Sequence, residues 1–228
     1  MLIGGLTKFS LIDYPGHTCA IIFTQGCNFR CPYCQNPELV LPEMFTEKMP
    51  TREVIDFLKK RAGLLDAVEF TGGEPTMQID LIEFAREIKN MGFKIKVDTN
   101  GTIPETIEEG LKARTIDYIA MDIKASLDRY EEVVKVSVNK EKIKRSIEII
   151  MKDAPDYEFR TTVIKGFHDK DEIERIGKTV NGASKFFIQR PQFYKTVEKG
   201  FKRESFSNTE LEEFKDALLK YVKTCAIR

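Results

Sequence analysis

The chain has 228 residues, enough for one domain with a full core that needs no disulfide bonds. Its 36 basic residues balance its 36 acidic ones, so the net charge gives no support for binding to nucleic acid or to an anionic membrane. The first residues lack a basic head before a long apolar run, and no apolar run approaches the roughly 20 residues of a membrane helix. We therefore expect a cytoplasmic protein with no membrane partner and no nucleic-acid partner.

Taken in chain order, short apolar runs that predict strands alternate with stretches of helical period. The predicted strands are residues 19–24, 67–71, 93–97, 116–123, 157–164 and 185–189. The predicted helices are residues 51–61, residues 79–90, a short helix opened by Pro104, a helix striped by Ile143, Ile147 and Ile150, residues 171–180 and residues 208–221.

This alternation favours an α/β fold, and more specifically a partial (β/α)6 barrel with a mostly parallel sheet and outer helices. Six units are fewer than the eight that close a full barrel, and an open doubly wound sheet is the alternative. The sequence shows no repeat and no linker, so we expect a single domain over residues 1–228. Residues 1–16 are expected to form an N-terminal extension, 17–190 the barrel core, and 191–228 a tail with a helix.

Polar or glycine-containing segments follow four of the predicted strands. These segments begin at Gly26, Gly72, Asp98 and Asp122. Ligands of α/β sheets gather at the C-terminal ends of the strands. We therefore expect the four segments to lie around one ligand site.

The five cysteines are too few and too clustered for a disulfide scaffold, which indicates metal or redox chemistry in a reducing compartment. Cys27, Cys31 and Cys34 have the spacing C-x3-C-x2-C, and thiolates suit zinc, copper(I) or iron–sulfur centres. Three thiolates can hold three corners of a 4Fe–4S cluster and leave one iron open. The alternatives are a zinc site completed by Cys19 or His17, and three buried thiols without a metal.

The cysteine segment, with the aromatic Tyr33 before its last cysteine, resembles the signature of the radical S-adenosylmethionine (SAM) superfamily. Residues 72–75, Gly-Gly-Glu-Pro, resemble the second motif of that superfamily. The resemblance implies a 4Fe–4S cluster held by the three cysteines, whose open iron binds the amino and carboxylate groups of SAM. It also implies that an electron from the reduced cluster cleaves SAM, and that the resulting deoxyadenosyl radical abstracts a hydrogen atom.

The resemblance further assigns SAM contacts to residues near the strand ends, namely Tyr33, Gly72, Gly73, Glu74, Pro75, Asp98, Thr99, Asn100, Asp122, Lys124 and Arg160. Glycine pairs and Asn-Gly pairs at strand ends are also common as ordinary turns. Asp122 and Lys124 share one face of a strand, so a structural ion pair is the alternative for them. Arg160 in a buried strand needs a partner, either the SAM carboxylate or Asp122. No role is assigned to His17, His168, Cys19 or Cys225.

Residues 10–16, SLIDYPG, resemble the Asp-Gly-Pro-Gly segment of glycyl-radical enzyme activases, with Tyr14 in place of the first glycine. The chain is thereby similar to anaerobic ribonucleoside-triphosphate reductase activating proteins and to pyruvate formate-lyase activating enzymes. This resemblance implies a radical SAM oxidoreductase that installs a glycyl radical on a partner enzyme. Reduced flavodoxin or ferredoxin is the implied electron donor.

Two alternatives to the activase hypothesis stay open at this point. One is a small-molecule enzyme such as the 7-carboxy-7-deazaguanine synthases, and the other is an iron–sulfur scaffold or electron carrier. A carrier has no need of the Gly-Gly-Glu-Pro motif. A protein substrate predicts an open barrel face that admits a glycine loop, whereas a small molecule predicts a closed pocket with additional polar groups.

Overall fold

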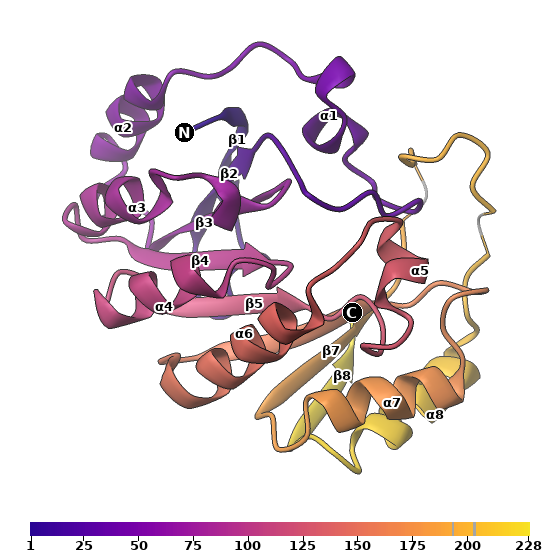
Figure 1. Cartoon of the computed structure of the whole chain (residues 1–228). Helices are drawn as coiled ribbons and strands as arrows, with labels where there is room; N and C mark the ends of the chain where they lie inside the picture. Colours follow the sequence, from indigo (N-terminus) through magenta and orange to yellow (C-terminus); the bar gives the residue numbers. More distant parts are fainter. Residues whose placement is uncertain (193, 203) are drawn as a thin grey trace.

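A computed structural model describes residues 1–192, 194–202 and 204–228 of the chain. Its strands and helices alternate along most of the chain (Figure 1). The strands are β1 (Ile3–Ser10), β2 (Cys19–Thr24), β3 (Ala67–Gly72), β4 (Lys94–Thr99), β5 (Tyr118–Asp122), β6 (Tyr157–Thr162), β7 (Lys185–Gln189) and β8 (Thr224–Ile227). The helices are α1 (Pro37–Val40), α2 (Thr51–Lys59), α3 (Leu81–Lys89), α4 (Pro104–Lys112), α5 (Tyr130–Val134), α6 (Lys140–Asp153), α7 (Lys170–Thr179) and α8 (Asn208–Leu218), with two 3-10 turns, η1 (Pro42–Met44) and η2 (Pro75–Met77).

All eight strands form one sheet in the order of the sequence, from β1 at one edge to β8 at the other. β1 pairs with β2 in antiparallel fashion, and every following neighbour pair is parallel. The sheet is not closed, because β1 and β8 are its two edges. The predicted α/β partial barrel is confirmed.

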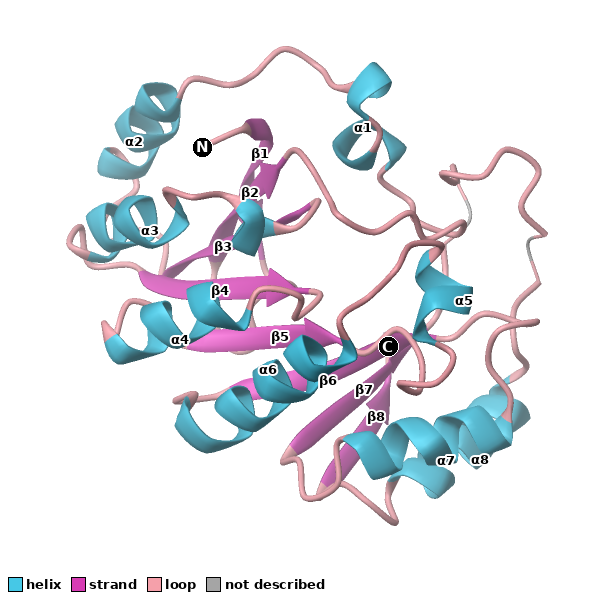
Figure 2. Ribbon diagram, viewed as in Figure 1, coloured by secondary structure: helices cyan, strands magenta, loops and turns pink. Residues whose placement is uncertain are grey.

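Successive side chains of a strand point to opposite faces of the sheet, so the sheet has one apolar face and one polar face. One face is apolar and packs against the helices, with Val68, Phe70, Ile95, Val97, Ile119, Met121, Phe159, Phe186 and Ile188 in the main core. Figure 2 shows the helices outside the curved sheet. The inner face carries charged and polar side chains instead, among them Glu69, Lys96, Asp98, Asp122, Glu158 and Arg160.

A small apolar cluster fills the interior of the barrel at the N-terminal ends of the strands. The turn between β1 and β2 places Tyr14 against Tyr118, with 5.5 Å between ring centroids. Cys19, Ile21, Ala67 and Ala120 complete this cluster. The turn that resembles the activase segment thus forms the floor of the barrel.

The six strands expected from the sequence all form, with end positions shifted by up to two residues, while two further strands were missed. β1 lies in the segment expected to be an extension, and it carries two glycines and three exposed positions, which weaken a strand pattern. β8 has only four residues and lies in the expected tail. No helix among the residues that the structure describes is long and apolar enough to cross a membrane.

Candidate active site

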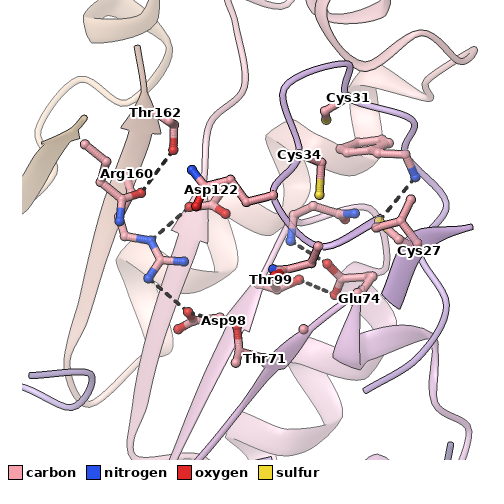
Figure 3. Close-up of a pocket in the computed structure, with 18 of the residues that line it drawn as sticks. Cys27, Cys31, Cys34, Thr71, Glu74, Asp98, Thr99, Asp122, Arg160 and Thr162 are labelled. Atoms are coloured by element: carbon pink, nitrogen blue, oxygen red, sulfur yellow. Dashed lines mark hydrogen bonds and ion pairs between the residues drawn. The ribbon is translucent and has the colours of Figure 1, made fainter. Parts of the chain in front are cut away.

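A cavity of about 480 Å³ lies at the C-terminal ends of the strands. The cysteine loop, residues 25–36 between β2 and α1, carries Cys27, Cys31 and Cys34 at one side of it (Figure 3). Asp98 and Arg160 lie across from them, on β4 and β6 (Figure 3). The four polar segments that follow the predicted strands therefore meet at one site.

The cavity lining includes every site residue predicted from the sequence except Pro75. Pro75 is buried and opens η2, behind the cavity wall. The lining also contains residues that the sequence did not single out for this site, such as Asp13, Glu69 and Thr162. Gln189 and Arg190, at the end of β7, complete the lining on the far side.

The cysteine loop is held in shape by side chains of the protein itself. Arg30 Nη1 donates to the carbonyl oxygens of Cys27 at 2.7 Å and Phe29 at 2.8 Å. The Arg30 amide donates to the carbonyl of Val134 at 2.9 Å, which joins the loop to α5. Because these bonds involve no thiol, they fix the path of the loop independently of any metal.

The three thiols lie in an environment that disfavours negative charge. Burial raises the pKa of Cys27 to about 12 and that of Cys31 to about 11, and it also raises the pKa of Cys34. Thiols of this kind are protonated near pH 7 until a metal binds and deprotonates them. The described His, Cys, Asp and Glu side chains form no group of three around a single metal ion.

The residues present fit an iron–sulfur cluster that has a second ligand beside it. Three soft donors share one cavity, and its volume leaves room next to them. The buried hydroxyl of Tyr33, within the cysteine loop, has no hydrogen-bond partner among the described residues. A buried hydroxyl without a partner is costly, so a bound group that pairs with it would remove that cost.

Gly72 and Gly73 bring the end of β3 into backbone contact with the end of β2 and with the start of the cysteine loop. Gly72 has φ +111°, and a Cβ there would lie 2.6 Å from the amide nitrogen of Thr24. A Cβ on Gly73 would lie only 2.1 Å from the carbonyl oxygen of Gly26. The amide of Glu74 donates to that same oxygen at 2.8 Å. The second motif and the cysteine loop therefore need glycine at these positions in order to pack together.

Glu74 is buried, and its carboxylate joins the ends of β3 and β4. It accepts hydrogen bonds from the Thr76 amide at 3.0 Å, the Thr99 hydroxyl at 2.8 Å and the Asn100 amide at 2.6 Å. The Thr76 hydroxyl is a fourth donor. Burial raises the pKa of Glu74, and these donors oppose the rise. Glu74 is thus a buried anchor between two parts of the cavity wall.

A row of alternating charges crosses the inner face of the sheet. Arg160 Nε lies 2.9 Å from Asp122 Oδ1, and Arg160 Nη1 lies 3.0 Å from Asp98 Oδ2 (Figure 3). Lys124 Nζ lies 3.0 Å from Asp122 Oδ2. The structure therefore contains both ion pairs that were weighed as alternatives to SAM contacts. All four groups also line the cavity, so the pairing fixes their orientation toward it.

The row continues into Lys96 and Glu69, which the sequence interpretation missed. Lys96 Nζ lies 2.8 Å from both Glu69 Oε1 and Asp98 Oδ1. Burial and the nearby Asp98 raise the pKa of Glu69 to about 9. Although burial works against it, Arg160 and Lys96 hold the pKa of Asp98 below its usual value. The signal for these residues was present, since charged residues alternate with apolar ones inside two predicted strands.

A segment after β7 runs beside the cysteine loop, as Figure 1 shows at the right of the molecule. The Val197 amide donates to the Cys34 carbonyl at 3.0 Å, and the Glu198 amide donates to the Pro32 carbonyl at 3.0 Å. Phe201 packs near Tyr33, with 6.3 Å between ring centroids. The expected tail therefore lies against the cysteine loop, a contact that no sequence pattern indicates.

The unassigned histidines and cysteines lie outside the cavity lining. His17 and Cys19 are at the N-terminal end of β2, about 16 Å from the cysteine loop by the rise of a six-residue strand, so neither completes a zinc site there. Cys225 is on β8. His168 is buried, and its Nε2 lies 3.0 Å from the carbonyl oxygen of Lys124 while its Nδ1 accepts from the Ile164 amide at 3.0 Å.

Comparison with known proteins assigns a family to this arrangement. The sequence pattern of the Radical SAM superfamily matches residues 21–178. A protein of Methanocaldococcus jannaschii named "Putative glycyl-radical enzyme activating enzyme" is 39% identical over 236 residues, which cover 100% of this chain and 95% of that protein. A GTP 3′,8-cyclase of Alkaliphilus oremlandii is 30% identical over 158 residues, which cover 68% of this chain and 49% of the cyclase. This chain thus spans about half the length of the cyclase.

Solved structures share the fold at low sequence identity. A domain of a pyruvate-formate lyase-activating enzyme from Bacteroides vulgatus superposes with a TM-score of 0.58 at 20% identity, covering 72% of this chain and 99% of that domain. SuiB of Streptococcus suis superposes with a TM-score of 0.71 at 13% identity, covering 91% of this chain and 48% of SuiB. Both the family pattern and the near full-length relative point to one conclusion: the chain is an enzyme of the radical SAM superfamily, whose members use a 4Fe–4S cluster and SAM.

Proposed function

We propose that this chain is a glycyl-radical enzyme activase, and that its partner is an anaerobic ribonucleoside-triphosphate reductase. The M. jannaschii relative, which matches the whole chain, bears the name of an activating enzyme of this class. The observation that carries the proposal is the open barrel, whose edges are β1 and β8. The cavity is lined by Asp13 and Phe23 near one edge and by Gln189 and Arg190 toward the other. An opening of this kind suits a narrow, glycine-bearing loop of a protein.

In this proposal Cys27, Cys31 and Cys34 hold the cluster, and the cavity beside them takes SAM. When bound, this pair supplies an electron and a carbon-centred radical, which no side chain can provide. The protein holds its three thiols on one loop, and the contact of Gly73 with Gly26 sets that loop against the second motif.

The polar wall of the cavity supplies the contacts to SAM. Arg160 and Lys124 are held by carboxylates and offer positive charge to the carboxylate of SAM. Asp98, Thr99 and Asn100 at the end of β4 contact its ribose or methionine part. Tyr33 contributes its buried hydroxyl. Because these groups are ordered by the protein, they lose little freedom when the ligand binds.

Three further elements complete the proposal. Reduced flavodoxin or ferredoxin delivers the electron to the cluster. Residues 1–228 act as one radical SAM domain, in which β1 and β8 belong to the barrel. The enzyme works in the cytoplasm, since free thiols such as those of this loop persist in a reducing compartment.

A small-molecule enzyme similar to the 7-carboxy-7-deazaguanine synthases is the second candidate. Two observations favour it: the cavity is lined by many charged and amide side chains, and a GTP 3′,8-cyclase is among the relatives. Most of the charged groups on the inner face are already paired with one another, which leaves fewer of them for a substrate.

Anaerobic reconstitution with iron and sulfide, followed by electron paramagnetic resonance, tests the proposal. Incubation with SAM, dithionite and an anaerobic ribonucleoside-triphosphate reductase should give a glycyl doublet. Cys31→Ala should abolish both the cluster spectrum and the doublet, whereas Cys225→Ala, outside the cavity, should retain them. SAM cleavage without a doublet, together with turnover of a purine precursor, would contradict the activase and support the second candidate.

A further inference from the structure

Arg228 directly follows β8 and is not among the residues that line the cavity, yet its side chain reaches a buried carboxylate inside the barrel. Arg228 Nη1 lies 2.8 Å from Glu158 Oε1, and Arg228 Nη2 lies 3.1 Å from Glu158 Oε2. The guanidinium carbon lies 3.4 Å from the centroid of the Phe187 ring, so the side chain passes over β7 to reach β6. Two bonds of this kind fix the geometry of an arginine–carboxylate pair.

The backbone of Arg228 is tied to the end of β7. Its amide donates to the Ile188 carbonyl at 2.8 Å, and its carbonyl accepts from the Arg190 amide at 2.9 Å. The preceding residues of β8 pair with β7 in parallel register. β8 therefore holds a guanidinium group at the inner face of the sheet, two strands away from Glu158.

Glu158 is fully buried, and two arginines lie near its carboxylate. Arg228 forms the two close bonds, and the Tyr118 hydroxyl donates to Oε2 at 2.8 Å. Arg160 is farther away, with 4.0 Å between its Nη1 and Glu158 Oε1. A buried carboxylate is costly unless a cation pairs with it. Arg228 supplies that cation, so Glu158 does not depend on Arg160 for its charge balance.

Arg160 is instead paired with two carboxylates nearer the cavity. Its Nη1 lies 3.0 Å from Asp98 Oδ2, and its Nε lies 2.9 Å from Asp122 Oδ1 (Figure 3). One guanidinium carries a single positive charge, which cannot balance three buried carboxylates. Without Arg228, the Glu158 carboxylate would therefore draw the Arg160 guanidinium toward itself. Glu158 lies two residues earlier on β6, so this movement leads toward the floor of the barrel and away from the cavity.

We infer that Arg228 is a positioning residue for SAM: by neutralising Glu158, it keeps Arg160 directed into the cavity, where Arg160 meets the carboxylate of SAM. The inference rests on the proposed function, and within it on the SAM contact of Arg160. Arg228 lies outside the cavity and acts through Arg160 alone. Its removal should therefore weaken SAM binding only while Glu158 carries a charge.

Arg228→Gln tests the inference in the reconstituted holoenzyme, with the dissociation constant of SAM measured by anaerobic calorimetry. Arg160→Gln reports the loss of the contact itself, and Arg228→Gln/Glu158→Gln removes the buried carboxylate together with its partner. The matched control is Arg175→Gln. The side chain of Arg175 is 41% exposed and lies 2.8 Å from the buried Glu172, just as Arg228 is 39% exposed and pairs with Glu158. Urea unfolding of each cluster-free variant gives its free energy of unfolding.

Arg228→Gln should bind SAM about tenfold more weakly than wild type, a loss of about 1.4 kcal/mol. The double variant should recover most of this affinity, and Arg228→Lys, which keeps the charge, should bind SAM more tightly than Arg228→Gln. Arg175→Gln should bind SAM like wild type, although it also unpairs a buried glutamate and should lower the free energy of unfolding similarly.

Wild-type affinity of Arg228→Gln would overturn the inference, and so would a double variant that binds SAM as weakly as Arg228→Gln. Either result would leave the SAM contact of Arg160 in place. Wild-type affinity of Arg160→Gln would overturn that contact, and the inference with it. None of these measurements needs the partner enzyme, so a missing glycyl doublet would overturn the activase proposal alone.

Discussion

Replacing Glu74 by glutamine should destabilise the fold by roughly 2–4 kcal/mol, although the two side chains have nearly the same shape. The carboxylate accepts hydrogen bonds on both oxygens, on Oε1 from Thr76 and Thr99 and on Oε2 from the Asn100 amide. An amide group has only one oxygen. Its NH2 must therefore face at least one N–H or O–H donor at this site.

The magnitude follows from the donors that lose their acceptor. A hydrogen bond to a charged group contributes about 1.5–3 kcal/mol, and a buried donor left without a partner costs about 1–3 kcal/mol. In the milder orientation the glutamine NH2 faces the Asn100 amide, which now lies 2.6 Å from Oε2. That orientation loses one charged hydrogen bond and places two donors against each other, and the remaining bonds to Oε1 become neutral and weaker.

Glu69→Gln is the matched control, because this buried glutamate is protonated whereas Glu74 is ionised. The pKa of about 9 leaves Glu69 protonated at pH 7, so glutamine does not remove a charge there. Oε1 accepts from Lys96 Nζ at 2.8 Å, and no donor is paired with Oε2. The amide can keep the first bond through its oxygen and turn its NH2 toward Asp98. At pH 7 the unfolded chain carries a charge at this residue and the folded chain does not, so glutamine removes the cost of taking up that proton on folding and should not destabilise the protein.

Urea unfolding of the cluster-free protein in reductant, followed by circular dichroism, gives both free energies of unfolding. The reasoning requires that Glu74→Gln be clearly more destabilising than Glu69→Gln. A change below about 1 kcal/mol for Glu74→Gln, or an equal or larger loss for Glu69→Gln, would refute the assignment of charges at the two sites.

Three other outcomes are expected. Gly73→Ala should destabilise the protein by about 1–3 kcal/mol and lower its iron content after reconstitution, since the new Cβ would lie 2.1 Å from the Gly26 carbonyl oxygen. Iron binding equal to that of wild type would contradict the role of this close contact. The free energy of unfolding should fall as the pH rises from about 5 to 9, because Glu69, with a pKa of about 9 in the folded protein, binds its proton more tightly there than in the unfolded chain. Glu69→Gln should reduce the slope of the free energy of unfolding against pH, measured by urea titrations at several pH values. An unchanged slope would count against the raised pKa of Glu69. His168→Phe should cost roughly 2–4 kcal/mol and raise the KM for SAM, because it unpairs the carbonyl of Lys124 and the buried amide of Ile164. Unaltered stability and KM would show that this histidine does not position Lys124.

The sequence was most informative where local pattern and packing agree. Buried parallel strands read as apolar runs, and the polar segments after them could be assigned to one sheet edge before their contacts were known. Tyr33, Glu74 and Asp98 were placed in the site on this ground and on family resemblance, and they line the cavity. Their individual SAM contacts stay predictions.

What the sequence could not give are contacts between segments that are distant along the chain. Glu69 and Lys96 lie on different strands, and only the register of β3 against β4 places them side by side. The backbone bonds of Val197 and Glu198 to the cysteine loop involve no particular side chain, so they leave no pattern. β1 was missed because an edge strand with glycines and exposed positions has little of the pattern of a buried strand.

The bonds that Arg30 makes within the cysteine loop have a consequence for how the enzyme matures. They hold the loop through carbonyl oxygens of Cys27 and Phe29, and Asn28 further ties it to Asn100 at 2.9 Å. Because none of these bonds uses a thiol, loss of the cluster would leave them in place. The thiols would release protons as they bind iron again.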